Sequence, residues 1–149
     1  LPTSRPTSGR AMKVVIMGSG RIGARVASSL ATDGHDVSVI ELNRTQAMNL
    51  SRALIDDGLI TLIIGDGSGS EAMLEAGIED ADVFLALSGN DALNGLAAQK
   101  AKSVYRTRRV VCRVKDEGLR ELYTSLGITV TSPTTLVADA ILQTVPDMP

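Results

Sequence analysis

The sequence predicts an α/β domain with a doubly wound, parallel sheet of about six strands and helices on both faces. Short runs of β-branched aliphatic residues alternate with amphipathic segments along most of the chain. Hydrophobic residues make up 44% of the 149 residues and aromatic residues only 2%, so the core is expected to be aliphatic. Parallel neighbours need crossover connections, and right-handed crossovers place helices on both faces of the sheet.

Strands are predicted where apolar residues form short continuous runs, because the strands of a parallel sheet are buried on both faces. These runs are 13–17, 37–42, 60–64, 83–87, 110–114 and 128–130. Helices are predicted where apolar positions recur at helical spacing. These segments are 21–32, 45–54, 71–76, 91–102, 119–126 and 133–145. The last helix begins at a proline, and its apolar face requires a partner, either this sheet or another subunit.

The chain is predicted to hold one domain between two short tails. Residues 1–11 are rich in Pro, Thr, Ser, Gly and Arg, with no methionine before Met12, so they are interpreted as a flexible tail or linker. The domain is expected to span 12–145, and 146–149 form the second tail. A chain of 149 residues buries roughly two-thirds of its unfolded surface, which suffices for one core.

Charge and hydropathy argue against two classes of partner. The formal net charge of −2 comes from acids and bases spread along the chain, so nucleic-acid binding is not expected. No apolar run approaches the roughly 18 residues that span a bilayer, so direct membrane insertion is not expected. We therefore expect a cytoplasmic protein, in which the single cysteine, Cys112, is a core thiol in a reducing compartment.

Four titratable residues are interpreted as structural. His35 lies between a predicted helix and a predicted strand and is expected to be a solvated turn residue, since no acid or nucleophile is positioned to act with it. Glu71, Glu75 and Glu79 recur at helical spacing and are expected on one solvated helical face. No second cluster of oxygen ligands accompanies them, so no metal site is predicted.

A glycine motif stands between the first predicted strand and the first predicted helix. It consists of Gly18, Ser19, Gly20, Arg21, Ile22 and Gly23, a G-x-G-x-x-G pattern. In the Rossmann fold the first glycine permits a tight turn, the second lets the backbone approach a pyrophosphate, and the third allows close helix packing. The helix that follows offers unpaired N–H groups at the positive end of its dipole. The motif therefore predicts a Rossmann-type nucleotide site, the alternative being a tight turn without a ligand.

Glu41 ends the second predicted strand, at about the spacing expected for the carboxylate that binds an adenosine ribose. An acid at this position disfavours a 2′-phosphate, so an unphosphorylated dinucleotide is expected. Arg44 lies nearby, where it either weakens that preference or stacks on adenine.

Three other polar residues each have two interpretations. Asp66 follows the third predicted strand in a glycine-rich turn, where it either caps backbone N–H groups or lines the nucleotide pocket. Pocket lining is favoured for it. Ser88 and Asn90 follow the fourth predicted strand and either cap the next helix or contact the ligand.

Beyond the glycine motif, several segments in order resemble one family. They are 65–68, 75–82, 88–91 with Asn94, 126–127 and 132–133. From Met12 to about Val145 the chain resembles the KTN or RCK nucleotide-binding domain of potassium channels and transporters, of the TrkA-N (Trk/Ktr) type. Several separate motifs in the same order argue against a chance likeness.

The resemblance implies a nucleotide-sensing regulatory domain rather than an enzyme. Such domains form homodimers, often assembled into rings, and bind NAD(H) or ATP, ADP or AMP to bias the gate of a membrane-embedded potassium channel or transporter. NAD(H) is the ligand expected first. The domain is then expected at the inner face of the cell membrane, held there by its partner.

The family pattern also implies which residues bind the ligand. These are Gly18, Ser19, Gly20, Arg21, Ile22, Gly23, Glu41, Leu42, Asn43, Arg44, Gly65, Asp66, Gly67, Leu87 and Ser88. By the resemblance, residues 18–22 hold phosphates, Glu41 holds the ribose, Asp66 and Gly67 border the adenine, and Leu87 and Ser88 line the pocket floor.

This sequence departs from the family pattern in two places. Glu41 stands where Asp is common, and Gly67 and Ser68 stand where Ala and Thr are common. The family's C-terminal ligand-binding domain is not expected within this chain, which implies a fragment of a longer protein or a separate partner domain.

Two rival functions remain beside the sensor. One is a fragment of an NAD-dependent oxidoreductase that lacks its substrate domain. The sequence disfavours it, because it offers no Tyr-x-x-x-Lys pair and no positioned His or Lys to transfer a proton beside a nicotinamide. The other is an assembly subunit whose nucleotide site is vestigial.

Overall fold

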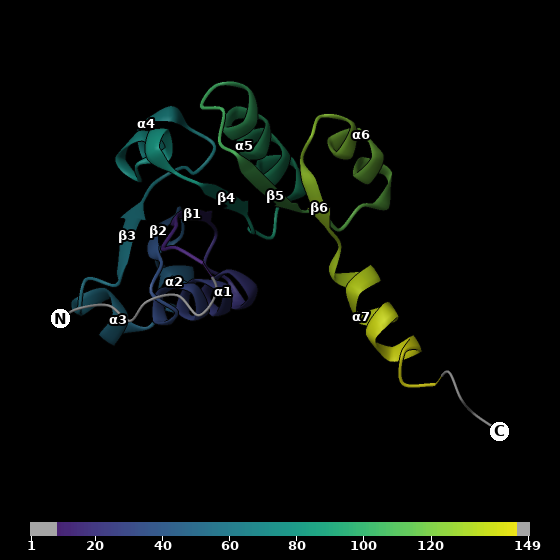
Figure 1. Ribbon diagram of the computed structural model, residues 1–149, viewed down its shortest axis with the longest axis horizontal. Coiled ribbons are helices and arrows are strands. Elements are labelled where there is room, and N and C mark those ends of the chain that lie inside the picture. Colours follow the sequence, from purple (N-terminus) through teal and green to yellow (C-terminus); the bar gives the residue numbers. More distant parts are fainter. Residues whose placement is uncertain (1–8, 146–149) are drawn as a thin grey trace.

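A computed structural model describes residues 9–145 and shows six parallel strands in the order β3-β2-β1-β4-β5-β6 (Figure 1). The strands are β1 Lys13–Met17, β2 Asp36–Glu41, β3 Ile60–Ile64, β4 Val83–Ala86, β5 Arg109–Arg113 and β6 Thr129–Thr131. Every neighbouring pair is parallel. The predicted doubly wound parallel sheet is therefore confirmed, with strand ends that differ from the predicted ones by at most one residue.

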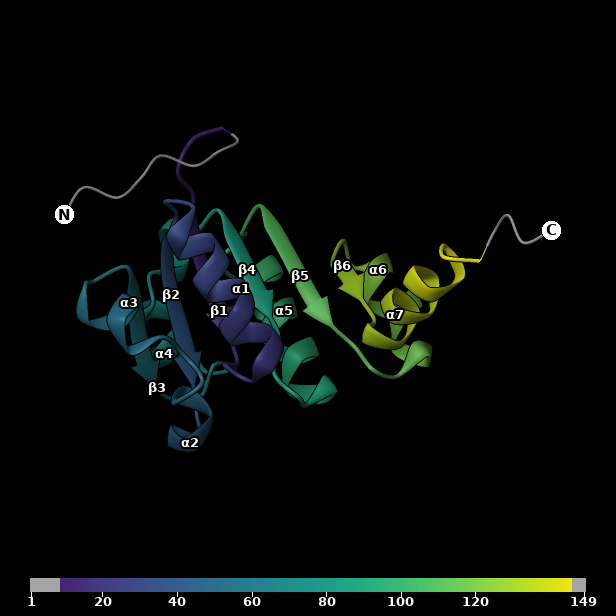
Figure 2. The ribbon, with the colours of Figure 1, turned by 90° about the horizontal axis from the view of Figure 1, so that it is seen from below.

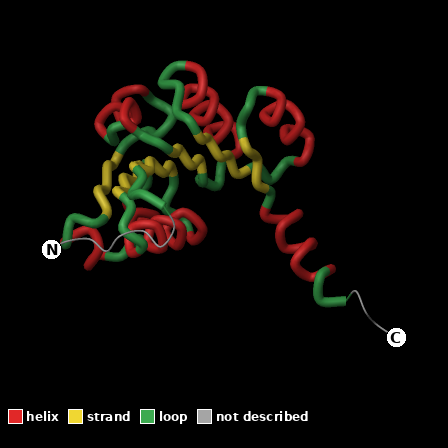
Figure 3. The backbone as a smooth tube through the Cα atoms, viewed as in Figure 1, coloured by secondary structure: helices red, strands yellow, loops and turns green. Residues whose placement is uncertain are grey.

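Apart from the last one, the helices cover the two faces of the sheet, as Figure 3 shows in red around the yellow strands. They are α1 Arg21–Thr32, α2 Arg44–Ala47, α3 Arg52–Asp56, α4 Ser70–Glu75, α5 Asp91–Ser103, α6 Arg120–Ser125 and α7 Pro133–Leu142, with short 3₁₀ turns η1 Ile78–Asp80 and η2 Glu117–Leu119. One apolar cluster joins α1 to the sheet, and a second joins α4, α5 and α6 to the opposite face. Figure 2 looks onto the face that α1 covers.

The strand order reverses at β1, which lies between β2 and β4. The chain fills one side of the sheet through β2 and β3, and then crosses to β4, β5 and β6 on the other side. In an open parallel sheet, the loops at the carboxyl ends of the strands separate at such a reversal and leave a crevice for a ligand. The fold thus places the candidate site at the carboxyl ends of β1 and β4.

The single helix predicted at 45–54 is wrong, because two short helices, α2 and α3, occupy this region. The Asn43 side chain caps α2 by accepting hydrogen bonds from the Thr45 and Gln46 amides. The Ser51 hydroxyl then accepts from the Leu54 amide at 3.3 Å and begins a new helix within the predicted segment. The Ser51 cap satisfies the Leu54 N–H group, which a continuous helix would have bonded to the Leu50 carbonyl.

The prediction of a solvated His35 is also wrong. Its side chain is buried, and Nδ1 accepts a hydrogen bond from the Met12 amide at 3.0 Å. The contact ties the turn after α1 to the start of β1. Cys112 is fully buried, as predicted, and burial raises the pKa of its thiol to about 12.

Helix α7 lies apart from the sheet (Figure 1). It ends at Leu142 rather than at 145, and within the described residues none of its side chains is buried. Its exposed apolar side chains are Leu136, Val137, Ile141 and Leu142. The prediction that this face packs against the chain's own sheet is therefore wrong. Packing against another subunit stays a prediction.

One carboxylate fastens the start of α7. Glu117 Oε1 accepts hydrogen bonds from the Ser132 hydroxyl at 2.8 Å and from the Thr135 hydroxyl at 2.9 Å. These bonds hold the pKa of the Glu117 carboxyl below its usual range. The direction in which α7 leaves the domain thus depends on a few polar contacts.

The two predicted tails fall mostly outside the described residues, which exclude 1–8 and 146–149. The described end of the first tail is exposed, and Arg10 forms an ion pair with Asp82 at 3.2 Å. No helix within 9–145 is long and apolar enough to cross a membrane.

Gly95 tests the packing of α5 against α6. A Cβ at this position would overlap the Tyr123 hydroxyl and ring, so we expect Gly95→Ala to lower the free energy of unfolding by about 1–3 kcal/mol, despite the better helix propensity of alanine. Urea denaturation measures this loss. Gly89→Ala is the matched control, because a Cβ there meets nothing within 4 Å. Equal stability of the two variants would contradict the packing described here.

Candidate nucleotide-binding site

A hollow of about 180 Å³ lies at the carboxyl ends of the strands, where the topology places a ligand crevice. It is lined by Met17, Gly18, Ile40, Glu41, Leu42, Asn43, Asp66, Gly67, Ser88, Asn90 and Leu93. The structure thus brings together predicted residues that follow β1, β2, β3 and β4. Met17 and Ile40 were not predicted to line the site. They come at or near the carboxyl ends of β1 and β2, so the rule that ligands bind at these ends identifies them.

The glycine turn depends on close approach between backbones. Gly18 has φ +103°, and a Cβ on it would lie 2.7 Å from the Ser88 amide nitrogen. A Cβ on Gly23 would overlap the Gly18 carbonyl oxygen. Larger residues at either position would therefore separate β1 from α1 or from the segment that follows β4.

Gly20 has a different role, since it is the N-cap residue of α1 and provides no side-chain cap. The first N–H groups of a helix have no partner within the helix, and they carry its partial positive charge. The nearest atom to a Cβ at Gly20 would be Gln46 Oε1, at 3.4 Å, so the position itself tolerates a Cβ. An anion could occupy the space in front of α1.

Glu41 is fixed between the glycine turn and α2. Its Oε1 accepts from the Ser19 amide at 2.7 Å and lies 3.0 Å from the Ser19 hydroxyl, and its Oε2 accepts from the Asn43 amide at 2.9 Å. The Ser19 hydroxyl also lies 2.9 Å from the Gln46 carbonyl, so its one proton serves either acceptor. A carboxylate accepts about four hydrogen bonds, which leaves capacity for ribose hydroxyls.

Both interpretations of Asp66 describe part of its environment. Its Oδ1 accepts from the Ser68 hydroxyl at 2.6 Å and from the Ser68 amide at 2.9 Å, which confirms the turn cap. These two bonds, helped by the charge of Lys100, hold the pKa of the Asp66 carboxyl below its usual range. Asp66 also lines the hollow, where its contact with a ligand stays a prediction.

Asn94, from the first turns of α5, organises the other side of the hollow. Its fully buried side chain accepts at Oδ1 from the Ser88 amide at 3.0 Å and hydroxyl at 2.6 Å. Its Nδ2 donates to the Ser88 and Arg113 carbonyl oxygens, both at 2.9 Å. These contacts use both of its donors and join α5 to the ends of β4 and β5. Asn90 caps α5 by accepting from the Leu93 amide, so the capping interpretation is confirmed for it.

Other predicted residues lie around the hollow without lining it. These are Ser19, Gly20, Arg21, Ile22, Gly23, Arg44, Gly65 and Leu87. Arg21 is exposed at the start of α1, and Leu87 is buried in the core. Arg44 borders a separate hollow of about 340 Å³ beside α2, α3 and β3.

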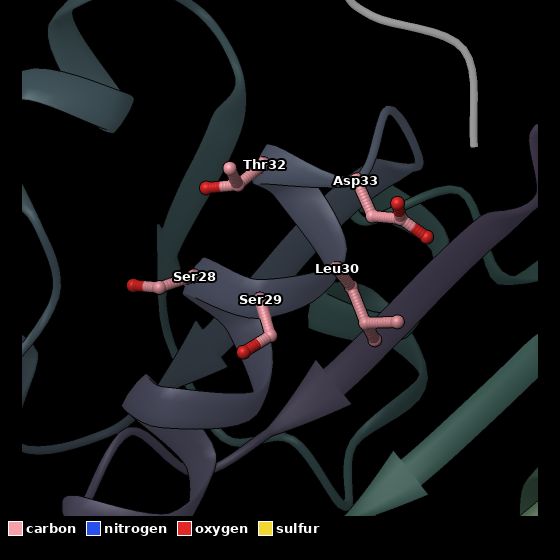
Figure 4. Close-up of a pocket in the computed structure, with 5 residues that line it drawn as sticks. All are labelled: Ser28, Ser29, Leu30, Thr32 and Asp33. Carbon is pink, nitrogen blue, oxygen red and sulfur yellow. The ribbon is translucent and has the colours of Figure 1, made fainter. Parts of the chain in front are cut away.

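A larger hollow of about 600 Å³ lies far from these residues, along the last turns of α1 (Figure 4). Its lining consists of Ser28, Ser29, Leu30, Thr32 and Asp33. It is bounded by one helix and its cap, whereas the smaller hollow draws residues from the ends of four strands. Convergence of loops, rather than volume, therefore marks the candidate site.

The predicted acidic face is partly wrong. Glu71 and Glu75 are exposed on α4, but Glu79 belongs to the 3₁₀ turn η1, because Gly77 with φ +83° ends the helix between them. Within the described part of the chain, no three His, Cys, Asp or Glu side chains are grouped closely enough to hold a metal ion.

The reversal of strand order, the glycine turn and the carboxylate that ends β2 together define a Rossmann-type domain. The model of the TrkA-N domain matches residues 14–133, so the chain belongs to the TrkA-N domain family, as the motifs predicted.

Known proteins agree with this assignment. The chain is 38% identical over 140 residues to a Trk system potassium uptake protein TrkA homolog of Pyrococcus horikoshii. The matched region covers 89% of this chain and 59% of that relative. The TrkA-N domain of the inner membrane protein ybaL from Escherichia coli has a TM-score of 0.79 at 19% identity, over 93% of this chain and all of that one. The Kef C-terminal domain of Shewanella denitrificans in its AMP-bound form has a TM-score of 0.73 at 21% identity, over 91% of this chain and 82% of that one.

Asn94 gives a test of how this edge of the sheet is held. Asn94→Ala leaves the Ser88 amide and the Arg113 carbonyl without their bonds to this side chain, and unsatisfied buried groups cost roughly 1–3 kcal/mol each. We expect a total loss of about 3 kcal/mol or more in urea denaturation. Asn90→Ala removes only a helix cap and should cost about 1 kcal/mol. If the two losses were equal, Asn94 would be no more than another cap.

Proposed function

We propose that this chain is a nucleotide-sensing regulatory domain that binds an adenine nucleotide at its glycine turn and controls a potassium channel or transporter. NAD(H) is the first candidate ligand, and ATP, ADP and AMP are the others. The observation that carries the proposal is the N-terminus of α1, uncapped by a side chain, beside the fixed carboxylate of Glu41 in a member of the TrkA-N family.

Each part of an adenine nucleotide has a chemically suitable neighbour. The N–H groups of α1 attract a phosphate through hydrogen bonds and the helix dipole. Glu41 accepts hydrogen bonds from the ribose hydroxyls, which disfavours a 2′-phosphate. Asp66 and Gly67 border the adenine, where the Gly67 backbone lies so close to Met17 that a Cβ would overlap its side chain.

The names of the relatives support the potassium-transport part of the proposal. The Pyrococcus horikoshii relative is named as a potassium uptake protein, and the Shewanella denitrificans Kef domain binds AMP. Because the chain spans 59% of the length of the first of these, the activity of the whole protein is carried over only as a proposal. Recognition rather than turnover is then the role of the bound nucleotide.

Regulation requires that the nucleotide bind two arrangements of the subunits with different affinity, since equal affinity would not shift the equilibrium between them. The exposed apolar side chains of α7 supply a contact between two copies of the chain, in a homodimer or a larger ring. The membrane-embedded partner then holds the domain at the inner face of the membrane.

Gly20 allows charge and size to be separated in a binding test. We expect Gly20→Asp to abolish nucleotide binding, because its carboxylate repels phosphate in front of α1, whereas a Cβ at this position makes only an ordinary contact. Calorimetric titration with NAD, NADH, ATP, ADP and AMP measures this. Gly20→Asn is the matched neutral control and should retain most of the affinity. Absence of binding to the folded wild-type chain would refute nucleotide sensing and favour a vestigial site.

The role of α7 predicts a change in oligomeric state. Ile141 is 59% exposed on the apolar face of α7, so Ile141→Glu should convert dimers of the chain to monomers by placing a charge in the contact. Sedimentation velocity at a series of protein concentrations measures this. Asp139→Asn, on the same helix, should leave the dimer intact. A wild-type chain that stays monomeric at high concentration would overturn the dimer proposal.

A further inference from the structure

The hollow beside α2, α3 and β3 is a second cavity, to which the nucleotide site assigns no role. It has a volume of about 340 Å³ and is lined mainly by apolar side chains, among them Met48, Ile55 and Ile64. Met48 is 82% exposed, so this lining is open to a partner. The two remaining lining residues are Arg44 and Arg52. Apolar surface that combines Met and Arg in this way is typical of contacts between proteins.

The positive charge of this hollow is only partly neutralised within the chain. Arg52 Nε lies 3.4 Å from Asp56 Oδ1, but both side chains are exposed, so solvent weakens the pair. Arg44 takes part in none of the ion pairs found among residues 9–145. A suitable occupant therefore presents an apolar side chain next to carboxylates.

Helix α4 of the same sequence presents that combination to solvent. Its buried residues, Ala72 and Met73, pack against the sheet. Leu74 is 45% exposed, and Glu71 and Glu75 are exposed beside it. Positions 71, 74 and 75 share one face, because residues three and four apart are neighbours on a helix. This face has the charge opposite to that of the hollow.

The hollow and the exposed face of α4 lie at the same edge of the sheet but on opposite sides of it. The edge strand is β3, and Figure 1 shows α3 and α4 on either side of this strand. Ile55 of α3 packs against one apolar cluster, and Met73 of α4 belongs to the other. Because the sheet separates them, a chain cannot place its own α4 in its own hollow. A second copy can, when the two copies stack face to face.

We propose that α4 of one copy binds in the hollow beside α2 and α3 of a second copy. Leu74 then fills the apolar part of the hollow, and Glu71 and Glu75 lie beside Arg44 and Arg52. Since the two copies use different surfaces, the contact is heterologous, and it extends into a ring or a row rather than closing a dimer. It is separate from the α7 contact and does not require a bound nucleotide.

The small size of α4 limits the strength of this contact. The helix has six residues, whereas a stable interface uses roughly 20–30 residues from each partner. The contact is therefore weak, and in solution it should appear only at concentrations well above those that populate the α7 dimer. In a larger assembly it would act together with the α7 contact.

Reversal of charge on each surface provides the test. The parent chain carries Ile141→Glu, which removes the α7 contact. The hollow variant adds Arg44→Glu and Arg52→Glu, and the helix variant adds Glu71→Lys and Glu75→Lys. Each chain, and an equal mixture of the two variants, is studied by sedimentation velocity at low ionic strength and at concentrations up to about 1 mM. Melting temperatures show that each variant is folded.

We expect the parent chain to form larger species as its concentration rises. Each variant alone should remain monomeric, because like charges then face each other across the contact. The equal mixture should associate again, since every hollow can then meet a helix of opposite charge. Leu74→Gln in the parent chain should weaken association about tenfold or more, because it removes the buried apolar side chain and leaves the charges unchanged.

Arg108 and Arg109 provide the matched control. Both are exposed at the amino end of β5, which three strands separate from β3. Arg108→Glu with Arg109→Glu should therefore leave the association of the parent chain unchanged.

Three results would overturn the inference. They are a parent chain that stays monomeric over the whole range, variants that associate alone as strongly as the parent, and a mixture of folded variants that does not associate. None of these measurements involves a nucleotide, so each of these results would leave the proposed nucleotide sensing untouched.

Discussion

The close approach of three backbone segments at the glycine turn is the constraint on which the sheet and the candidate site both depend. Gly18 lies against the backbone at Ser88, and Gly23 lies against the Gly18 carbonyl. Because a Cβ at either glycine would overlap these atoms, the two positions exclude every other residue unless the backbone moves. The start of α1 is thereby held over the ends of β1 and β4, where the strand order reverses.

Polar contacts on each side of this turn give the hollow its shape. Glu41 connects the turn to α2, and Asn94 connects the ends of β4 and β5 to α5. These contacts are made within the chain and need no ligand. A nucleotide would therefore meet a largely preformed site, and little of its binding free energy would be spent on ordering loops.

The sheet could be predicted from the sequence because each strand is a continuous apolar run, which local composition reveals. The errors arose where contacts between distant parts of the chain decide the outcome. His35 is buried because Met12, on another element, donates to it. The helix at 45–54 divides because Ser51 caps a new start, which the apolar spacing did not show.

The candidate site likewise contains residues that local sequence reveals and residues whose role depends on distant contacts. Gly18, Glu41 and Asp66 could be found from motif and spacing, and the structure brings them to one hollow. The role of Asn94 could not be predicted in this way, because its four bonds join strand ends that are distant along the chain.

The isolation of α7 has a mechanical consequence. No side chain of this helix is buried among the described residues, and Glu117 fastens its first turn through two hydroxyl groups. Because neither apolar cluster includes a residue of α7, a change in the angle of this helix would break its bonds to Glu117 and leave both clusters packed. A subunit bound along α7 would then be displaced whenever contacts at the start of the helix changed its angle.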